Sequence, residues 1–102
     1  MSKWVKVFKV ADIGGEGLGI TFSGEQVLLV RKGDEVFALS GVCSHQEMEL
    51  CGGEIEDEAW ICPHHGARFG LRDGKALSMP AVEDIRTWAV KCEDGWVLLE
   101  EE

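Results

Sequence analysis

Two cysteine–histidine motifs that lie close together place the strongest constraint on how this chain of 102 residues folds. Cys43 and His45 form a C-x-H pair, and Cys62 and His65 form a C-x-x-H pair. Each pair fits one short loop that presents a thiolate and an imidazole, so two loops can serve a single metal centre. This ligand set suits either one tetrahedral zinc ion or a two-iron, two-sulfide cluster with two cysteines on one iron and two histidines on the other. Spacing alone leaves both metals open.

The residues around the two motifs favour the iron–sulfur cluster. The stretch CSH at 43–45 and the stretch CPHHGARF at 62–69 resemble the two cluster loops of the Rieske iron–sulfur proteins, particularly the small Rieske ferredoxins that serve bacterial oxygenases. The resemblance continues through LRDGKAL at 71–77, MPAV at 79–82 and TWAVK at 87–91. It implies one Rieske-type [2Fe-2S] cluster per chain, with the ligands Cys43, His45, Cys62 and His65.

Other residues near the motifs have more ordinary interpretations. His64 neighbours His65, but the C-x-x-H register favours His65 as the ligand and leaves His64 beside the centre or on the surface. We expect Cys51 and Cys92 to be small buried side chains. We expect the tryptophans to pack in the core. In Rieske proteins a proline segment covers one side of the cluster, and the resemblance assigns that position to Pro80.

Alternation of polar and apolar residues predicts a chain built from short strands. The expected strands are 4–10, 20–22, 26–31, 35–39, 54–56, 59–61, 86–92 and 96–100. Asp94-Gly95 is the strongest hairpin turn signal, residues 70–74 are expected to be turns, and no helix longer than a turn or two is predicted. The fold class is therefore all-β. The resemblance implies a Rieske-type antiparallel β-sandwich or barrel with a small cluster-binding subdomain made of two loops.

The chain is expected to be one Rieske domain, 1–102. The base fold should comprise about 1–42 and 81–102, and the cluster-binding subdomain about 43–80.

Charge and hydropathy restrict the partners. Nineteen acidic and ten basic residues give a formal net charge of −9, which argues against nucleic acid and anionic membrane as partners. The acidic residues between the motifs suit either a docking patch for a basic protein face or a solvated surface. The longest apolar run, near 27–30, is far too short to span a membrane, and the N-terminus lacks the apolar stretch of a signal peptide. We therefore expect a cytoplasmic protein whose remaining cysteines stay reduced.

The resemblance also predicts a low reduction potential. High-potential Rieske proteins of respiratory complexes carry a serine and a tyrosine just after the second loop, and a disulfide that clamps the two loops. Ala67 and Phe69 stand at the first two positions here, and Met48 and His64 stand at the disulfide positions. Because hydrogen bonds to the cluster sulfurs raise the potential, we expect a value below about 0 mV, in the lower part of the Rieske range.

As a function, the resemblance implies a soluble electron carrier that is not itself an enzyme. It would pass single electrons from an NAD(P)H-dependent flavoprotein reductase to a terminal oxygenase, binding both transiently as a monomer. Three alternatives remain at this point. They are the Rieske-type small subunit of an assimilatory NAD(P)H nitrite reductase, a carrier for some other redox system, and a structural zinc module that mediates protein interaction.

Overall fold

The computed structural model describes residues 3–15, 17–41, 52–63, 67–78 and 84–101, which form strands and one short 3-10 helix, η1 (Val10–Asp12). The strands are β1 (Lys3–Lys9), β2 (Leu18–Phe22), β3 (Glu25–Lys32), β4 (Glu35–Ser40), β5 (Glu54–Glu56), β6 (Ala59–Ile61), β7 (Arg68–Gly70), β8 (Ala76–Ser78), β9 (Thr87–Trp88), β10 (Val90–Glu93) and β11 (Trp96–Glu101). All strand pairs are antiparallel. The predicted all-β class is confirmed.

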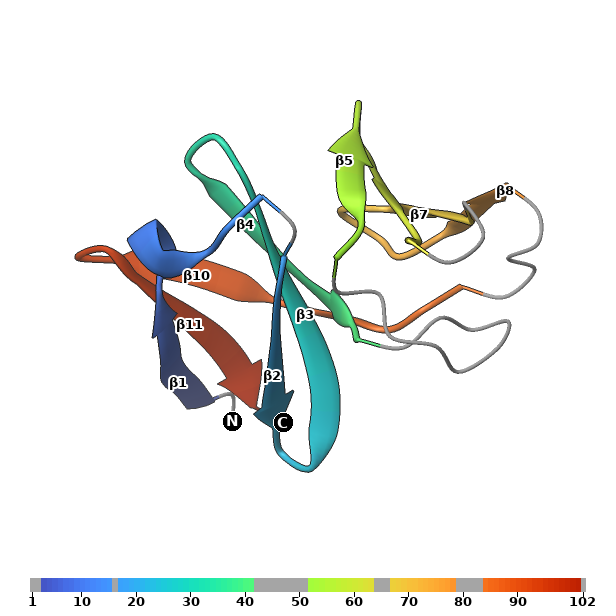
Figure 1. Ribbon diagram of the computed structural model, residues 1–102. Helices are drawn as coiled ribbons and strands as arrows, with labels where there is room; N and C mark the ends of the chain where they lie inside the picture. Colours follow the sequence, from blue (N-terminus) through green and yellow to red (C-terminus); the bar gives the residue numbers. More distant parts are fainter. Residues whose placement is uncertain (1–2, 16, 42–51, 64–66, 79–83, 102) are drawn as a thin grey trace.

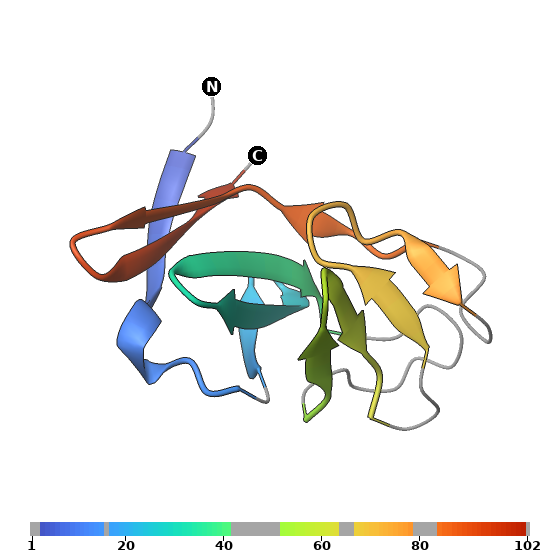
Figure 2. The same cartoon turned by 90° about the horizontal axis from the view of Figure 1, so that it is seen from above.

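The strands form three sheets, with the orders β1-β11-β10, β2-β3-β4-β9 and β5-β6-β7-β8. Figures 1 and 2 show the β2-β3-β4-β9 sheet between the other two, which lie on opposite sides of the molecule. The two chain ends lie near one another, because β1 and β11 pair along their length. Among the described residues, no helix is both long and apolar enough to cross a membrane.

The central strand β3 is buried on both faces. Successive side chains of a strand point to opposite faces, so the apolar run in β3 supplies two cores. Val27 and Leu29 pack in a core that includes residues of β11, whereas Leu28 and Val30 pack in a second core that includes residues of β6 and β7. This arrangement explains why four consecutive apolar residues form a strand without alternation.

Several expected strands match closely, and one is divided in two. The bounds of β5 and β6 are as predicted, and the turn at Asp94-Gly95 has the positive φ angles, 52° and 80°, that a tight hairpin requires. The expected strand 86–92 is interrupted at Ala89. Its first part, β9, pairs with β4, whereas its second part, β10, pairs with β11, so the segment passes from one sheet to another.

Two short strands, β7 and β8, were not predicted, since only turns were expected directly after the second motif. They are held by pairing with β6 and with each other, and their register shifts between Arg68 and Phe69. Three-residue strands next to glycines carry little local signal, so only the pairing partner reveals them.

The tryptophans divide into two groups. Trp60 and Trp88 are buried in the two cores, as predicted. For Trp4 and Trp96 the expectation of core packing was wrong. Both are only partly buried, and both lie beneath lysine ammonium groups on the β1-β11-β10 sheet.

Candidate metal centre

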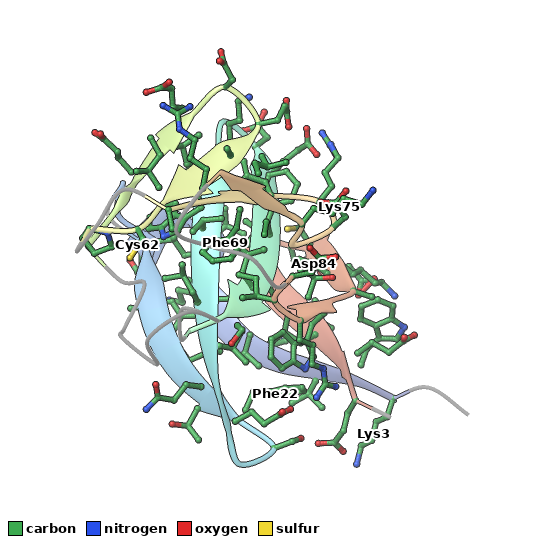
Figure 3. All side chains as sticks on the ribbon, turned by 90° about the vertical axis from the view of Figure 1, so that its right-hand side faces the viewer. Lys3, Phe22, Cys62, Phe69, Lys75 and Asp84 are labelled. Carbon is green, nitrogen blue, oxygen red and sulfur yellow. The ribbon has the colours of Figure 1, made fainter. Side chains whose placement is uncertain are left out.

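Cys62 is the one predicted ligand within the described residues, and the local backbone fixes its position. It follows directly on β6, which pairs with β7 through Ile61 and Arg68. The Cys62 N–H donates a hydrogen bond to the Ala67 carbonyl oxygen at 2.8 Å, so Cys62 is held against the residue that leads into β7. Only 2% of Cys62 is exposed, and the thiol is free of any disulfide. Figure 3 shows Cys62 beside Phe69 on the face formed by the β5-β6-β7-β8 sheet.

Two glycines bring the chain that leaves the first motif against the strand that enters the second. Gly52 has a φ of 94°, in the region that favours glycine. A Cβ at Gly53 would lie less than 3.0 Å from the carbonyl oxygen of Ile61, so only glycine fits there without a shift of the backbone. Beside this contact lies a surface hollow of about 400 Å³, lined by Gly52, Gly53, Glu54, Ile61, Cys62 and Pro63. The close approach thus fixes the start of β5 against the end of β6.

The side chains beneath Cys62 are apolar. Trp60, Ala67 and Phe69 are all completely buried and belong to the same core as Cys62. None of the buried side chains in the described part of the chain is polar or charged. A centre at Cys62 would therefore have a dry, apolar support on this side, and Ala67 and Phe69 offer no hydroxyl group to it.

Backbone and carboxylate hydrogen bonds hold Asp84 and Ile85 against the segment that precedes and begins β8. The Asp84 carboxylate accepts a hydrogen bond from the Ala76 N–H at 2.9 Å. The Ile85 N–H donates to the Gly74 carbonyl oxygen at 2.8 Å. Gly74 has a φ of 70°, and a Cβ there would collide with the Ile85 carbonyl group. The β7–β8 connection and the start of the last segment are therefore held as one unit.

The acidic charge of the β5–β6 hairpin is partly neutralised. Glu58 forms an ion pair with Lys32 at 3.0 Å, and Glu56 forms one with Arg68 at 3.0 Å. The hydrogen bond and positive charge of Lys32 lower the pKa of the exposed Glu58 carboxyl. Lys32 also donates a hydrogen bond to the Asp57 carbonyl oxygen at 2.7 Å, which ties this hairpin to β3. The carboxylate groups available to a partner are thus fewer than the sequence suggests.

The other predicted site residues cannot be placed. Cys43, His45 and His65 lie outside the described residues, as do the neighbouring residues Met48, Cys51, His64 and Pro80, so the four-residue ligand set stays a prediction. The expectation that Cys92 is buried was wrong. It lies on the exposed surface of β10 at the edge of its sheet, although partial burial still raises the pKa of its thiol.

Comparison with known proteins identifies the family. The sequence of residues 3–89 matches the family model of the Rieske [2Fe-2S] domain. The chain belongs to the Rieske [2Fe-2S] family. The family implies an iron–sulfur cluster, and the free, buried Cys62 thiol at a strand end fits such a cofactor, because a soft thiolate is the ligand that iron–sulfur clusters take.

Rieske relatives of similar length are named as ferredoxins. The chain is 32% identical over 99 residues to the ferredoxin component of the naphthalene 1,2-dioxygenase system of Pseudomonas putida, covering 96% of this chain and 95% of the relative. It is 39% identical over 96 residues to the ferredoxin component of biphenyl 2,3-dioxygenase from Rhodococcus jostii (strain RHA1), covering 93% of this chain and 90% of the relative.

Solved structures agree with these relatives. The ferredoxin of carbazole 1,9a-dioxygenase from Nocardioides aromaticivorans IC177 superimposes with a TM-score of 0.87 at 31% identity, covering 94% of this chain and 95% of that one. A chain in the complex of reduced oxygenase and oxidised ferredoxin of carbazole 1,9a-dioxygenase gives a TM-score of 0.83 at 26% identity, with 94% and 91% covered. A nitrite reductase small subunit from Mycobacterium tuberculosis gives a TM-score of 0.87, but its 22% identity shows the fold alone.

Proposed function

We propose that this protein is a Rieske ferredoxin that carries single electrons from an NAD(P)H-dependent flavoprotein reductase to a terminal oxygenase acting on an aromatic ring. The observation that carries this proposal is the full-length similarity to proteins named as ferredoxin components of dioxygenase systems, which spans 96% of this chain and 95% of the naphthalene system's ferredoxin. Within such a system the protein is an electron-transfer component, and catalysis belongs to the oxygenase.

We assign Cys43, His45, Cys62 and His65 as ligands of one [2Fe-2S] cluster per chain. When bound, that cluster supplies a centre that accepts and releases one electron. The residues of the chain contribute the support. The strand ending at Ile61 and the hydrogen bond from Cys62 to Ala67 orient the thiolate, and the buried rings of Trp60 and Phe69 exclude water from that side.

The same surroundings support a low reduction potential. Side-chain hydrogen bonds that stabilise negative charge on a cluster sulfur raise the potential. Ala67 and Phe69 are buried beside Cys62 and carry no hydroxyl group. We therefore propose a potential below about 0 mV, within the lower part of the Rieske range.

We further propose that the two motif loops and the β5-β6-β7-β8 sheet form a cluster-binding subdomain at about 43–80, and that the remaining strands form the base of one Rieske domain. The reductase and the oxygenase would bind in turn, each transiently, to a monomeric carrier in the cytoplasm. A cytoplasmic setting agrees with the free and exposed Cys92 thiol, which a reducing compartment keeps reduced.

A redox titration of the purified protein followed by electron paramagnetic resonance tests the carrier assignment, with iron, acid-labile sulfide and zinc counted on the same sample. We expect two irons and two sulfides per chain, a mixed histidine–cysteine signal in the reduced state, and a potential below about 0 mV. Zinc in place of iron and sulfide, in protein made with ample iron, would make the proposal wrong and favour a structural zinc module.

The ligand assignment is tested by a matched pair of variants. Cys62→Ser should abolish cluster incorporation, because an alkoxide is too hard a ligand to replace a thiolate. Cys92→Ser makes the same chemical change at an exposed position on β10 and should retain a full complement of iron. Equal iron content in the two variants would contradict the role of Cys62.

The nitrite reductase alternative is tested by the assembly state. A diffusible carrier should elute alone from a sizing column when purified from its native organism. Stable co-purification with a large haem or flavin subunit would instead favour a permanent subunit of a nitrite reductase.

A further inference from the structure

The outer face of the β1-β11-β10 sheet is rich in lysine and tryptophan, in contrast to the acidic character of the whole chain. Val5, Val97 and Leu99 point inward to the core shared with β3. The residues of opposite alternation on the three strands therefore point outward, and we call them the Lys–Trp face: Trp4, Lys6, Lys9, Lys91, Glu93, Trp96, Leu98 and Glu100. Three lysines and two glutamates stand on this face, in a chain with a formal net charge of −9.

Cation–π contacts organise the Lys–Trp face. The Nζ atoms of Lys6 and Lys9 lie 5.1 Å and 5.4 Å from the centre of the same Trp96 ring. Lys91 Nζ lies 5.3 Å from the centre of the Trp4 ring. The face of an indole attracts a cation at such distances, so these contacts hold the ammonium groups over two half-buried aromatic rings. The result is a positive surface with apolar patches beneath it.

Two of these lysines, Lys6 and Lys9, have no carboxylate partner in the described part of the protein. Lys91 forms an ion pair with Glu93 at 3.4 Å. Lys6 and Lys9 share one ring, and no described carboxylate lies within ion-pair distance of either. Two like charges held over one ring repel each other, and a carboxylate brought from outside would interact favourably with both. The geometry therefore favours an anionic ligand.

The Lys–Trp face lies far from the candidate metal centre. The β1-β11-β10 sheet and the β5-β6-β7-β8 sheet are separated by the central sheet, as Figure 2 shows. Lys3, at the start of β1, and Cys62 also lie well apart in the view of Figure 3. A molecule bound to the Lys–Trp face would therefore leave the side of the protein that carries the candidate metal centre accessible.

We propose that the Lys–Trp face is a docking surface for an acidic segment on the surface of a partner protein. Tryptophan is among the residues that carry most of the binding energy in protein interfaces, and Trp4 and Trp96 are both partly exposed here. The lysine charges above them complement a negatively charged surface. A compact acidic segment can align its carboxylates with Lys6 and Lys9 alone. A nucleic acid or an anionic membrane presents extended negative charge that would also meet the glutamates of the face and the repulsion of the whole chain.

This inference extends beyond the proposed electron transfer and does not depend on it. It adds a second binding surface. A partner protein bound there could stay attached while other proteins bind and dissociate in turn at the candidate metal centre. Such attachment raises the effective concentration of a carrier near its partner without any contact at the metal centre.

The proposal can be tested by titrating the ¹⁵N-labelled full-length holoprotein with poly-L-glutamate of about twenty residues at low ionic strength. We expect saturable shifts of the indole N–H resonances of Trp4 and Trp96, with much smaller shifts for the buried Trp60. The double variant Lys6→Glu/Lys9→Glu should weaken binding at least tenfold, and Lys6→Gln/Lys9→Gln should weaken it by a smaller factor.

Lys75→Glu provides the matched control, because Lys75 is an exposed lysine in the connection between β7 and β8, away from the Lys–Trp face. It should change the affinity less than twofold. Absence of indole shifts, or an equal loss of affinity in Lys75→Glu, would overturn the proposal. So would tighter binding to a 20-base-pair DNA duplex or to phosphatidylserine-containing vesicles than to poly-L-glutamate. A self-association that Lys6→Glu/Lys9→Glu abolishes would assign the face to a second copy of the chain instead.

Discussion

Gly53 is the residue whose replacement most directly tests how β5 is held against the strand that leads to Cys62. A Cβ at this position would lie less than 3.0 Å from the Ile61 carbonyl oxygen and 3.1 Å from each of two indole atoms of Trp60. The first obstacle is backbone, and Trp60 is completely buried, so neither can move aside easily. Gly53→Ala must therefore displace β5 from β6 or shift the chain that leads back to the first motif.

The expected cost follows from this geometry. Overpacking a close-packed region by one methyl group destabilises a protein by about 1–3 kcal/mol. For a domain of this size, that loss lowers the apparent melting temperature by roughly 5–15 °C. The strain falls between the two motifs, so we also expect the cofactor's visible absorption to disappear at a lower temperature than in the wild type, in step with the circular dichroism or ahead of it.

Gly19→Ala is the matched control for this measurement. Gly19 lies in β2, and apart from Gly19 and its two chain neighbours no heavy atom of the described residues lies within 4 Å of the Cβ that alanine would add. This variant should be as stable as the wild type, or more stable by up to about 1 kcal/mol, because alanine restricts the unfolded chain. Both variants should be heated at one scan rate, since loss of a cluster makes unfolding irreversible. Equal melting temperatures for Gly53→Ala and the wild type would refute the close-approach argument.

Three further predictions concern the potential, the acid stability and the return of the chain after residue 83. Ala67→Ser should raise the reduction potential by roughly 20–60 mV, the equivalent of one modest hydrogen bond in a one-electron couple; an unchanged potential with intact cluster would contradict the role of this position. Lys32→Met should lower the free energy of unfolding more at neutral pH than in acid, as urea titrations at several pH values would show; the hydrogen bond from Lys32 to the Asp57 carbonyl oxygen is lost at every pH, whereas the Glu58 contact contributes only above the acid range. The reason is that the folded-state pKa of Glu58 lies below its ordinary value of 4.5, so the stability from this contact is present above that pH and is lost as the pH falls through the lowered pKa. Gly74→Ala should lower the melting temperature more than Gly33→Ala, because both residues have positive φ, at 70° and 62°, but only the Cβ at 74 meets a neighbouring carbonyl group; equal losses would leave backbone strain as the whole effect.

Much of the fold follows from local pattern. The hairpin of β5 and β6 was predicted with its bounds because the alternating run EIE at 54–56 and the apolar run AWI at 59–61 lie on either side of the Asp57 turn, where φ is 56°. The Rieske family could also be predicted from the sequence, because the two cysteine–histidine motifs and the stretches that follow them resemble that family closely. These features lie within short windows of sequence, where side-chain alternation and turn chemistry decide the structure.

The features that the sequence did not predict depend on contacts between residues that are far apart in the sequence. β7 and β8 exist because β6 offers a partner, and the change of sheet at Ala89 depends on where β4 and β11 lie. Cys92 alternates with Lys91 as a core residue would, yet it is exposed because β10 is an edge strand close to a turn. The close approach at Gly53 carries a sequence signal, two adjacent glycines after Cys51, but its meaning appears only when β5 lies against β6.

The double burial of β3 has a consequence for anyone who wishes to divide this protein or graft its metal centre onto another scaffold. The β5-β6-β7-β8 layer that carries Cys62 supplies only part of its own core, and Leu28 and Val30 supply another part from β3 in the neighbouring sheet. A fragment that contains only the proposed cluster-binding subdomain, about 43–80, would expose Trp60 and Phe69 to water. We expect such a fragment not to fold by itself, so the smallest portable unit must include β3 and β4. Deleting one residue within β3 would also exchange the side chains of both cores at once.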